Sequence, residues 1–223
     1  MNAFFVAGTD TDVGKTYVSA LLLKSAAQAG LSSLGLKPIA AGAELVGDQL
    51  QNDDAEQLMS ASSIELPYAA VNPVCLAEAM APHLAAKRAG VELKCDELLE
   101  QVRQSLHLAE ADLSLVEGAG GWRVPLVPGF DMADLARALD LPVILVVGMR
   151  LGCLNHAQLS AEAILKDGLS LAGWIANELD TPMHCLDENI ETLAELMPAP
   201  MLARVSSGAL SLDISKVLKK LKS

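Results

Sequence analysis

Near its amino terminus the chain reads Gly8-Thr9-Asp10-Thr11-Asp12-Val13-Gly14-Lys15-Thr16, and no other segment constrains the architecture as strongly. The segment lies between a short apolar run, Ala3 to Ala7, and a longer stretch with helical periodicity. A glycine-rich turn between a strand and a helix lets backbone N–H groups approach phosphate oxygens, and the helix start adds positive partial charge. The segment therefore predicts a P-loop that binds the phosphates of a nucleotide.

Within this motif, the residue types predict separate tasks. Lys15 is expected to reach the β- and γ-phosphates, and Thr16 to offer its hydroxyl to magnesium. Five residues, rather than the usual four, separate Gly8 from Gly14, so the loop is one residue longer than the common pattern. The alternative is a glycine-rich turn that arose by chance. Gly-Lys-Thr at the start of a helix, directly after the first strand, argues against that alternative.

Composition restricts the classes of partner. The net charge of −12 repels phosphate backbones, so we expect no nucleic-acid partner. The longest apolar run, near Leu141 to Gly148, is too short to span a bilayer, and the first residues lack the features of a signal peptide. We therefore expect a cytoplasmic protein without a membrane partner. Reduced, mostly buried thiols are expected at the widely spaced cysteines Cys75, Cys95, Cys153 and Cys185.

Short apolar runs alternate with amphipathic stretches along residues 1–223, which predicts a single α/β domain with a mostly parallel sheet and helices on both faces. Strands are expected at Ala3–Ala7, Leu34–Lys37, Leu113–Glu117, Pro142–Val147, Leu171–Asn177 and Pro200–Val205. Helices are expected at Gly14–Ala29, Asp96–Leu108, Met132–Leu139, His156–Lys166 and Leu186–Met197. A short C-terminal helix is expected to carry Lys216, Lys219, Lys220 and Lys222 on a solvated face.

Two segments, Pro38 to Asn52 and Gly118 to Gly129, do not follow the alternation. Long loops that follow strands often carry the chemistry of an α/β protein. We therefore expect both segments to border the site.

Acidic and basic residues stand where expected strands end. Glu117 closes a buried strand, so it is a candidate magnesium ligand, with a simple turn acid as the alternative. Lys37 ends another strand and is predicted to point to the same edge. Asp53 and Asp54 open a further expected helix, where they could cap the helix or serve the site, and the residues alone leave both interpretations open.

The segment from Gly148 to His156 joins the most apolar strand to a helix. Its free N–H groups could bind a carboxylate. From the residues alone we favour a simple connection in which Asn155 is the N-cap of the helix.

Together, several motifs resemble the dethiobiotin synthetase family in type and in order. These are GTDTDVGKT at 8–16, GLKP at 35–38, NDDA at 52–55, VNP at 71–73, VEGAGG at 116–121, LPVILVVG at 141–148, LGCLNHA at 151–157, LAGWIAN at 171–177 and PAP at 198–200. The longer phosphate loop is itself a trait of that family. The resemblance extends to about residue 205, and residues 206–223 match only weakly.

The resemblance implies a homodimer that converts 7,8-diaminopelargonate, carbon dioxide and MgATP into dethiobiotin, ADP and phosphate, the penultimate step of biotin synthesis. It implies that Lys15 and Lys37, with Thr11, surround the reacting groups. For the nucleotide it implies Asp12, Val13, Gly14, Lys15, Thr16, Tyr17, Asp54, Glu117, Gly118 and Asn177. For the substrate it implies Lys37, Gly118, Gly152, Cys153, Leu154 and Asn155, the last four across the dimer. For magnesium it implies Thr16, Asp54 and Glu117.

Some positions depart from the family pattern. Ala41 replaces a serine that touches substrate, Asn189 replaces a tyrosine, and Ser206 replaces a proline beside the adenine. These departures bear on substrate affinity and base preference. Residues 177–180 also half resemble a guanine-reading motif, but its lysine is absent, so ATP is the expected nucleotide.

Two other classes compete with this interpretation. A partitioning-type ATPase switch would carry a signature lysine early in the loop, whereas here no basic residue precedes Lys15. An amidase-type ligase of the same fold would need an attached glutaminase domain, for which the chain has no room. A homologue without activity would also fit the fold, but the chain retains the expected site residues.

Overall fold

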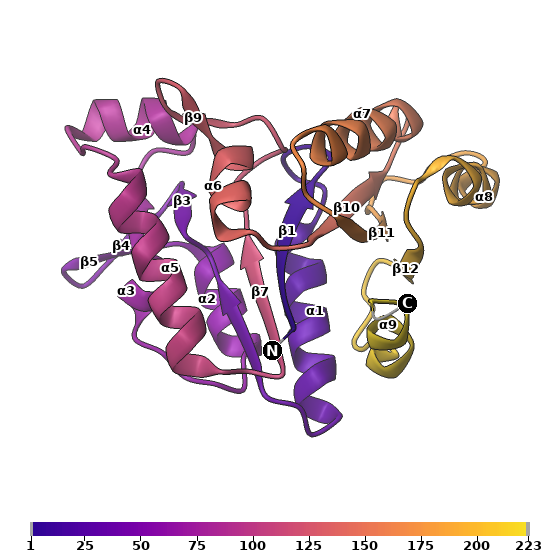
Figure 1. The fold of residues 1–223 in the computed structure, drawn as a ribbon, viewed down its shortest axis with the longest axis horizontal. Coiled ribbons are helices and arrows are strands. Elements are labelled where there is room, and N and C mark those ends of the chain that lie inside the picture. Colours follow the sequence, from indigo (N-terminus) through magenta and orange to yellow (C-terminus); the bar gives the residue numbers. More distant parts are fainter. Residues whose placement is uncertain (1, 222–223) are drawn as a thin grey trace.

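The computed structural model describes residues 2–221, and its centre is a six-stranded parallel sheet in the order β12-β11-β10-β1-β7-β2 (Figure 1). In chain order the strands are β1 (Asn2–Gly8), β2 (Ser33–Leu36), β7 (Leu113–Glu117), β10 (Val143–Met149), β11 (Leu171–Glu178) and β12 (Met201–Val205). All seven residues of β10 are buried, as a central parallel strand covered on both faces requires. The predicted fold class is confirmed.

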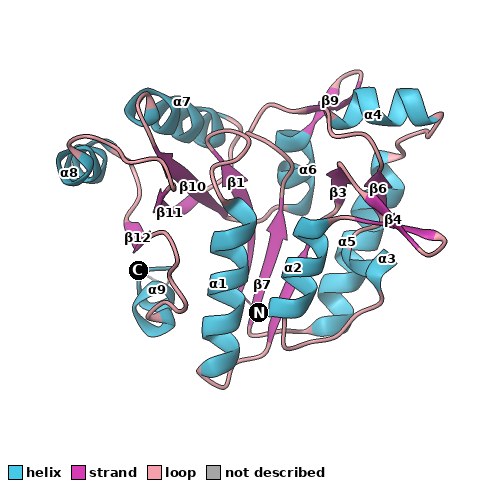
Figure 2. Cartoon of the chain, turned by 180° about the vertical axis from the view of Figure 1, so that it is seen from behind, coloured by secondary structure: helices cyan, strands magenta, loops and turns pink. Residues whose placement is uncertain are grey.

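Helices cover both faces of this sheet. One layer contains α1 (Lys15–Gln28), α2 (Asp53–Ala61) and α9 (Ile214–Leu221), and Figure 2 shows α1 and α2 in front of β7. The opposite layer contains α5 (Cys95–Ala109), α6 (Met132–Leu139), α7 (Cys153–Lys166) and α8 (Leu186–Leu196). Along β1, Phe4 and Val6 join the first core while Phe5 and Ala7 join the second. Successive side chains of one strand thus point to opposite faces of the sheet and pack into two separate cores.

Short elements fill the long connections, and the sequence did not predict them. Two short strands, β3 (Ile39–Ala41) and β6 (Val74–Leu76), pair in parallel. Two hairpins follow, β4 (Glu44–Val46) with β5 (Gln49–Gln51), and β8 (Pro125–Val127) with β9 (Phe130–Asp131). The same connections also contain two short helices, α3 (Tyr68–Val71) and α4 (Pro82–Ala89).

The expected strands and helices are present, with shifted ends. The largest shift is in α7, which begins at Cys153 rather than His156 because Gly152, at φ 96°, is its N-cap. Asn155 therefore lies inside the first turn, and the prediction that it caps the helix is wrong. At the carboxyl terminus, the lysines of α9 are exposed as predicted, while Lys222 lies outside the described residues.

Two expectations about the whole chain can be compared with residues 2–221. The four cysteines form no disulfide, but only Cys153 is buried, so the prediction of mostly buried thiols is wrong. Within the described range, every helix is too short or too polar to cross a bilayer.

Candidate active site

A cleft of about 800 Å³ opens at the carboxyl edge of the sheet, where β1, β7 and β2 end. Ligands bind at this edge in open α/β sheets, at the point where the strand order changes direction. Residues predicted for the site line the cleft, namely Thr11, Asp12, Gly14, Lys15, Thr16, Tyr17, Lys37 and Asp54. Ala41, which stands where the family pattern has a serine, also lines the cleft.

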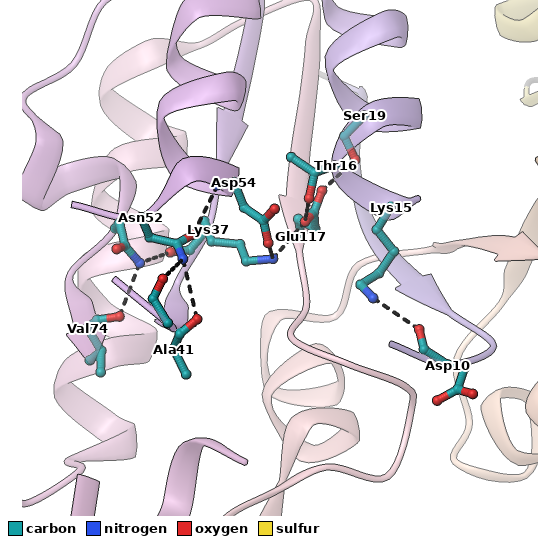
Figure 3. Close-up of polar contacts among 12 residues, drawn as sticks. Asp10, Lys15, Thr16, Ser19, Lys37, Ala41, Asn52, Asp54, Val74 and Glu117 are labelled. Carbon is teal, nitrogen blue, oxygen red and sulfur yellow. Dashed lines mark hydrogen bonds and ion pairs between the residues drawn. The ribbon is translucent and has the colours of Figure 1, made fainter. Parts of the chain in front are cut away.

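The phosphate loop is shaped by two residues with positive φ. Asp12 has φ 57° and Gly14 has φ 81°, and Gly14 is the N-cap of α1. Because a glycine cap has no side chain, it leaves the first N–H groups of α1 free for a ligand. The Lys15 ammonium donates a hydrogen bond to the Asp10 carbonyl at 3.2 Å (Figure 3). The loop therefore presents N–H groups and an ammonium to the cleft, as phosphate binding requires.

Asn177, near the end of β11, contacts the phosphate loop through its side chain. Its amide donates to the Val13 carbonyl at 2.9 Å, and its side chain is buried. Within residues 2–221 its Oδ1 has no hydrogen-bond partner. An amide oxygen without a partner can accept from a ligand donor.

A buried cluster of charges lies beside the loop (Figure 3). Lys37 Nζ donates to Glu117 Oε1 at 2.7 Å and to Asp54 Oδ2 at 2.8 Å. The Thr16 hydroxyl donates to Glu117 Oε1 at 2.7 Å. Both Lys37 and Glu117 are buried, with exposed fractions of 3% and 0%. Removing one member would leave a buried charge without its partner, so the cluster is sensitive to single substitutions.

The two lysines of the cleft have opposite pKa shifts. Burial lowers the pKa of Lys15, and the nearby positive charge of Lys37 lowers it further. Burial also acts to lower the pKa of Lys37, but the charges and hydrogen bonds of Glu117 and Asp54 outweigh it, so the pKa is raised. Burial acts to raise the pKa of Asp54, but the charge and hydrogen bond of Lys37, together with Thr16 and the charge of Lys15, outweigh it, so the pKa is lowered. Lys37 therefore remains an ammonium over a wide pH range.

The oxygen donors in this cluster fit a hard divalent cation. Thr16, Asp54 and Glu117 contribute one hydroxyl and two carboxylates, the ligand types that Mg²⁺ prefers. In this structure Lys37 Nζ bridges the two carboxylates. The donor set therefore fits magnesium, although no group of three His, Cys, Asp or Glu side chains gathers within residues 2–221.

Other predicted site residues lie outside the cleft lining. Gly118 is buried, and a Cβ there would meet the Phe5 ring at 3.0 Å, so it packs on the core. The segment Gly152 to Asn155 forms the start of α7, with Gly152 and Asn155 exposed. Their roles stay predictions, and so do those of Val13, which lies within the loop, and of Asn177, which contacts it.

Several residues that support the cluster were not predicted from the sequence. The Ser19 hydroxyl donates to Glu117 Oε2 at 2.9 Å. Ser19 lies three positions after Thr16, on the same face of α1, so helical spacing was a usable signal. Asn52 and Asn72 stand inside two of the quoted motifs, and both are buried and hydrogen-bonded near Lys37. Arg150 pairs with Asp10 of the phosphate loop, which no spacing indicated.

Fold and site together define a P-loop nucleotide-binding protein of the α/β class. A family described as an AAA domain matches residues 2–211. The ATP-dependent dethiobiotin synthetase BioD of Pseudomonas aeruginosa (strain UCBPP-PA14) is 58% identical over 205 residues, covering 92% of this chain and 90% of that protein. The protein of the same name from Cellvibrio japonicus (strain Ueda107) is 54% identical and covers 91% and 88%. The chain belongs to the dethiobiotin synthetase family.

Solved structures at low sequence identity share the fold. The septum site-determining protein MinD from Pyrococcus horikoshii, complexed with Mg-ADP, has a TM-score of 0.55 and 18% identity, covering 98% of this chain and 86% of that chain. The signal recognition particle receptor FtsY from Elizabethkingia anophelis has a TM-score of 0.58 and 12% identity, covering 100% and 65%. At this identity the likeness concerns architecture alone. The partitioning-type switch is therefore not favoured over the much more similar synthetases.

Proposed function

We propose that this protein is an ATP-dependent ligase that closes a cyclic urea on 7,8-diaminopelargonate to form dethiobiotin, in biotin synthesis. The observation that carries the proposal is the cleft in which Lys15 and Lys37 stand beside a phosphate loop and two carboxylates. Family membership supports it independently, because the relatives with 50–58% identity are named ATP-dependent dethiobiotin synthetases.

The proposed reaction proceeds in three steps. One substrate amine adds to carbon dioxide and loses a proton, giving a carbamate. A carbamate oxygen then attacks the γ-phosphorus of ATP, and ADP leaves as a mixed anhydride forms. The second amine attacks the carbonyl carbon and loses a proton, forming the second C–N bond as the C–O bond to phosphate breaks. Phosphate leaves, and the ring is closed.

The side chains of the cleft suit this sequence of steps. Negative charge develops on the carbamate and on the transferred phosphoryl group, and preorganised cations stabilise such charge. In this proposal Lys15 contacts the terminal phosphates, and Lys37 contacts the γ-phosphate and the carbamate. Among the described residues that line the cleft there is no histidine or cysteine. Alignment and charge neutralisation, rather than side-chain acid–base work, would supply most of the rate enhancement.

Magnesium is the proposed metal, held by Thr16, Asp54 and Glu117. When bound, it would neutralise charge on the phosphates of ATP. Lys37 contacts both carboxylates, so it lies beside the proposed metal ligands. The ammonium can thus neutralise oxygen atoms on the reacting group without leaving the cluster.

A homodimer and a cytoplasmic location complete the proposal. Leu151 is 95% exposed at the start of α7, next to the segment Gly152 to Asn155. We infer that Leu151 belongs to an apolar surface that a second copy of the chain covers. The helix start there would bind the carboxylate of a substrate held by the partner subunit. A cytoplasmic location is proposed because the reaction consumes ATP.

The test is a product assay with two variants. Purified protein is mixed with MgATP, bicarbonate and 7,8-diaminopelargonate, and phosphate release is followed together with a product heavier by the ureido carbonyl. Lys15→Gln and Lys37→Gln should each reduce turnover by roughly two orders of magnitude or more, with circular dichroism unchanged. The proposal would be contradicted if phosphate were released at the same rate with and without the diamine and no ureido product formed. Near-normal turnover in one variant would remove the role of that lysine alone.

A further inference from the structure

Behind the charged cluster lies a buried polar network that the proposed chemistry does not use. Its members are Asn52, Tyr68 and Asn72, from two motifs and from the short helix α3. We propose that Tyr68 is a positioning residue whose hydroxyl fixes Lys37 relative to Asp54, and so sets the geometry of phosphoryl transfer. This inference rests on the function proposed above, because it presumes that Lys37 acts on the reacting groups.

The first half of the network holds the backbone of Lys37. The Lys37 N–H donates to the Val71 carbonyl at 2.9 Å, and the Lys37 carbonyl accepts from the Asn72 amide at 2.6 Å. The same amide also donates to the Val74 carbonyl at 3.1 Å. Asn72 is 2% exposed. Lys37 follows the last residue of β2, so the hydrogen bonds of the sheet do not hold its backbone. The contacts with Val71 and Asn72 hold it instead.

The second half holds the helix that carries Asp54. The Asn52 side-chain oxygen accepts from the Asp54 N–H at 3.1 Å, which makes Asn52 the N-cap of α2. The Asn52 amide also lies 3.4 Å from the carbonyls of Ala41 and Gly42, as Figure 3 shows for Ala41. Asn52 thereby connects the Asp54 helix to the end of β3, where Ala41 lines the cleft.

The Tyr68 hydroxyl joins these two halves. It accepts from the Asn52 N–H at 2.8 Å and donates to the Asn72 Oδ1 at 3.0 Å. Burial raises the pKa of Tyr68, with a further contribution from Cys75 at 3.5 Å, so the hydroxyl keeps its proton. One group therefore connects the cap of the Asp54 helix to the residue that holds the Lys37 carbonyl. Without it, a buried N–H and a buried amide oxygen would lose their partners.

A purely structural role is the competing explanation, and the chain offers a matched control. Ser105 is 4% exposed, and its hydroxyl donates to the Ala70 carbonyl at 2.9 Å, so it also anchors α3. Its hydroxyl makes no hydrogen bond to Asn52 or Asn72 among the described residues. Ser105→Ala therefore removes a buried hydrogen bond from the same helix and leaves the connection to Lys37 intact.

The experiment compares steady-state kinetics of Tyr68→Phe and Ser105→Ala in the full chain. We expect Tyr68→Phe to lower kcat by roughly 10- to 100-fold with little change in the KM for ATP, because small misplacements of a reacting group are costly. Each variant loses a hydrogen bond that anchors α3, so we expect the two to lower the melting temperature by similar amounts. Ser105→Ala should nevertheless leave kcat within about twofold of the wild-type value. Asn72→Ala should resemble Tyr68→Phe, and the double variant should lose no more than the worse single variant.

Each outcome decides the inference. Wild-type kcat in Tyr68→Phe, or an equal loss in Ser105→Ala, would overturn it. If Tyr68→Phe does not fold, Asn72→Ala against Ser105→Ala makes the same comparison. Failure of the proposed function looks different, because the wild-type protein itself would then form no ureido product. An inactive Lys37→Gln together with a fully active Tyr68→Phe would refute this inference alone.

Discussion

At the scale of single residues, two buried lysines in one cleft have different electrostatic surroundings. Lys37 is paired with two carboxylates, so its ammonium is compensated in the protein itself. Lys15 has only the Asp10 carbonyl as a hydrogen-bond acceptor among the described contacts, and its pKa is lowered by burial and by Lys37. An ammonium held next to another cation is ready to pair with an incoming anion. Lys15 therefore depends on its phosphate ligand for compensation.

This difference predicts how ATP use depends on pH. As pH rises toward the lowered pKa, free enzyme loses the Lys15 proton at a pH below the ordinary value of 10.5. We expect kcat/KM for ATP to fall over that alkaline range. The raised pKa of Lys37 places its own loss of charge, and of its ion-pair stabilisation, above 10.5. Measurement of kcat/KM across alkaline pH tests this order.

Lys15→Arg is the control for that measurement, because a guanidinium stays protonated throughout the range. This variant should show no decline over the same pH range, whatever its absolute rate. An identical alkaline decline in both proteins would assign the titration to another group.

At the scale of elements, the phosphate loop is held between β1, α1 and the end of β11. Gly14 makes this arrangement possible, because a Cβ there would lie 2.2 Å from the Asn177 amide nitrogen, and its φ of 81° is unfavourable for other residues. Asn177 in turn holds the Val13 carbonyl. The loop conformation thus depends on a contact between segments 164 positions apart in sequence.

Gly14→Ala is therefore expected to weaken MgATP binding by roughly tenfold or more, since strain of about 1–3 kcal/mol adds to the collision with Asn177. Calorimetric titration measures the change. Gly129→Ala is the matched control, because Gly129 has a nearly equal φ of 80° but no atom within 4 Å of the position that a Cβ would take. Equal losses of affinity in the two variants would attribute the effect to general strain rather than to the loop.

At the scale of the whole molecule, the start of α7 combines a predicted substrate segment with an exposed apolar surface. Leu151 and Leu159 are 95% and 56% exposed there. The cleft beside the phosphate loop lies elsewhere, and its lining does not include Gly152 to Asn155. A second copy of the chain would bring this segment to a cleft, which is how the proposed homodimer would complete two equivalent sites.

Leu151→Asp is expected to shift the protein toward monomer in sedimentation and to raise the KM for the diamine, because a charge would be buried in the proposed interface. Leu108→Asp, at a site that is 68% exposed near the end of α5, should change neither property. A wild-type protein that is monomeric at assay concentrations and fully active would rule out the shared site.

The sequence alone determined the sheet, its covering helices and the phosphate loop. The spacing of apolar residues is a local property of the sequence, so it predicted the strands β1, β7, β10 and β11. The Gly-Lys-Thr turn likewise predicted the phosphate loop. The ends of the expected strands indicated Lys37 and Glu117, and the resemblance added Asp54. The structure brings the three together through hydrogen bonds from the Lys37 ammonium. The prediction that residues 1–223 form a single domain, whose last residues 206–223 match the family only weakly, stays a prediction.

Only the tertiary structure decided the short strands of the long connections, the start of α7 and the partners behind the cluster. Tyr68 carries no local signal, because its role comes from hydroxyl contacts with Asn52 and Asn72, which other segments deliver. Likewise Asn155 fits an N-cap by residue type, yet the conformation of Gly152 starts the helix earlier. Periodicity records which face of an element is buried, whereas hydrogen bonds between segments depend on how those elements are packed together.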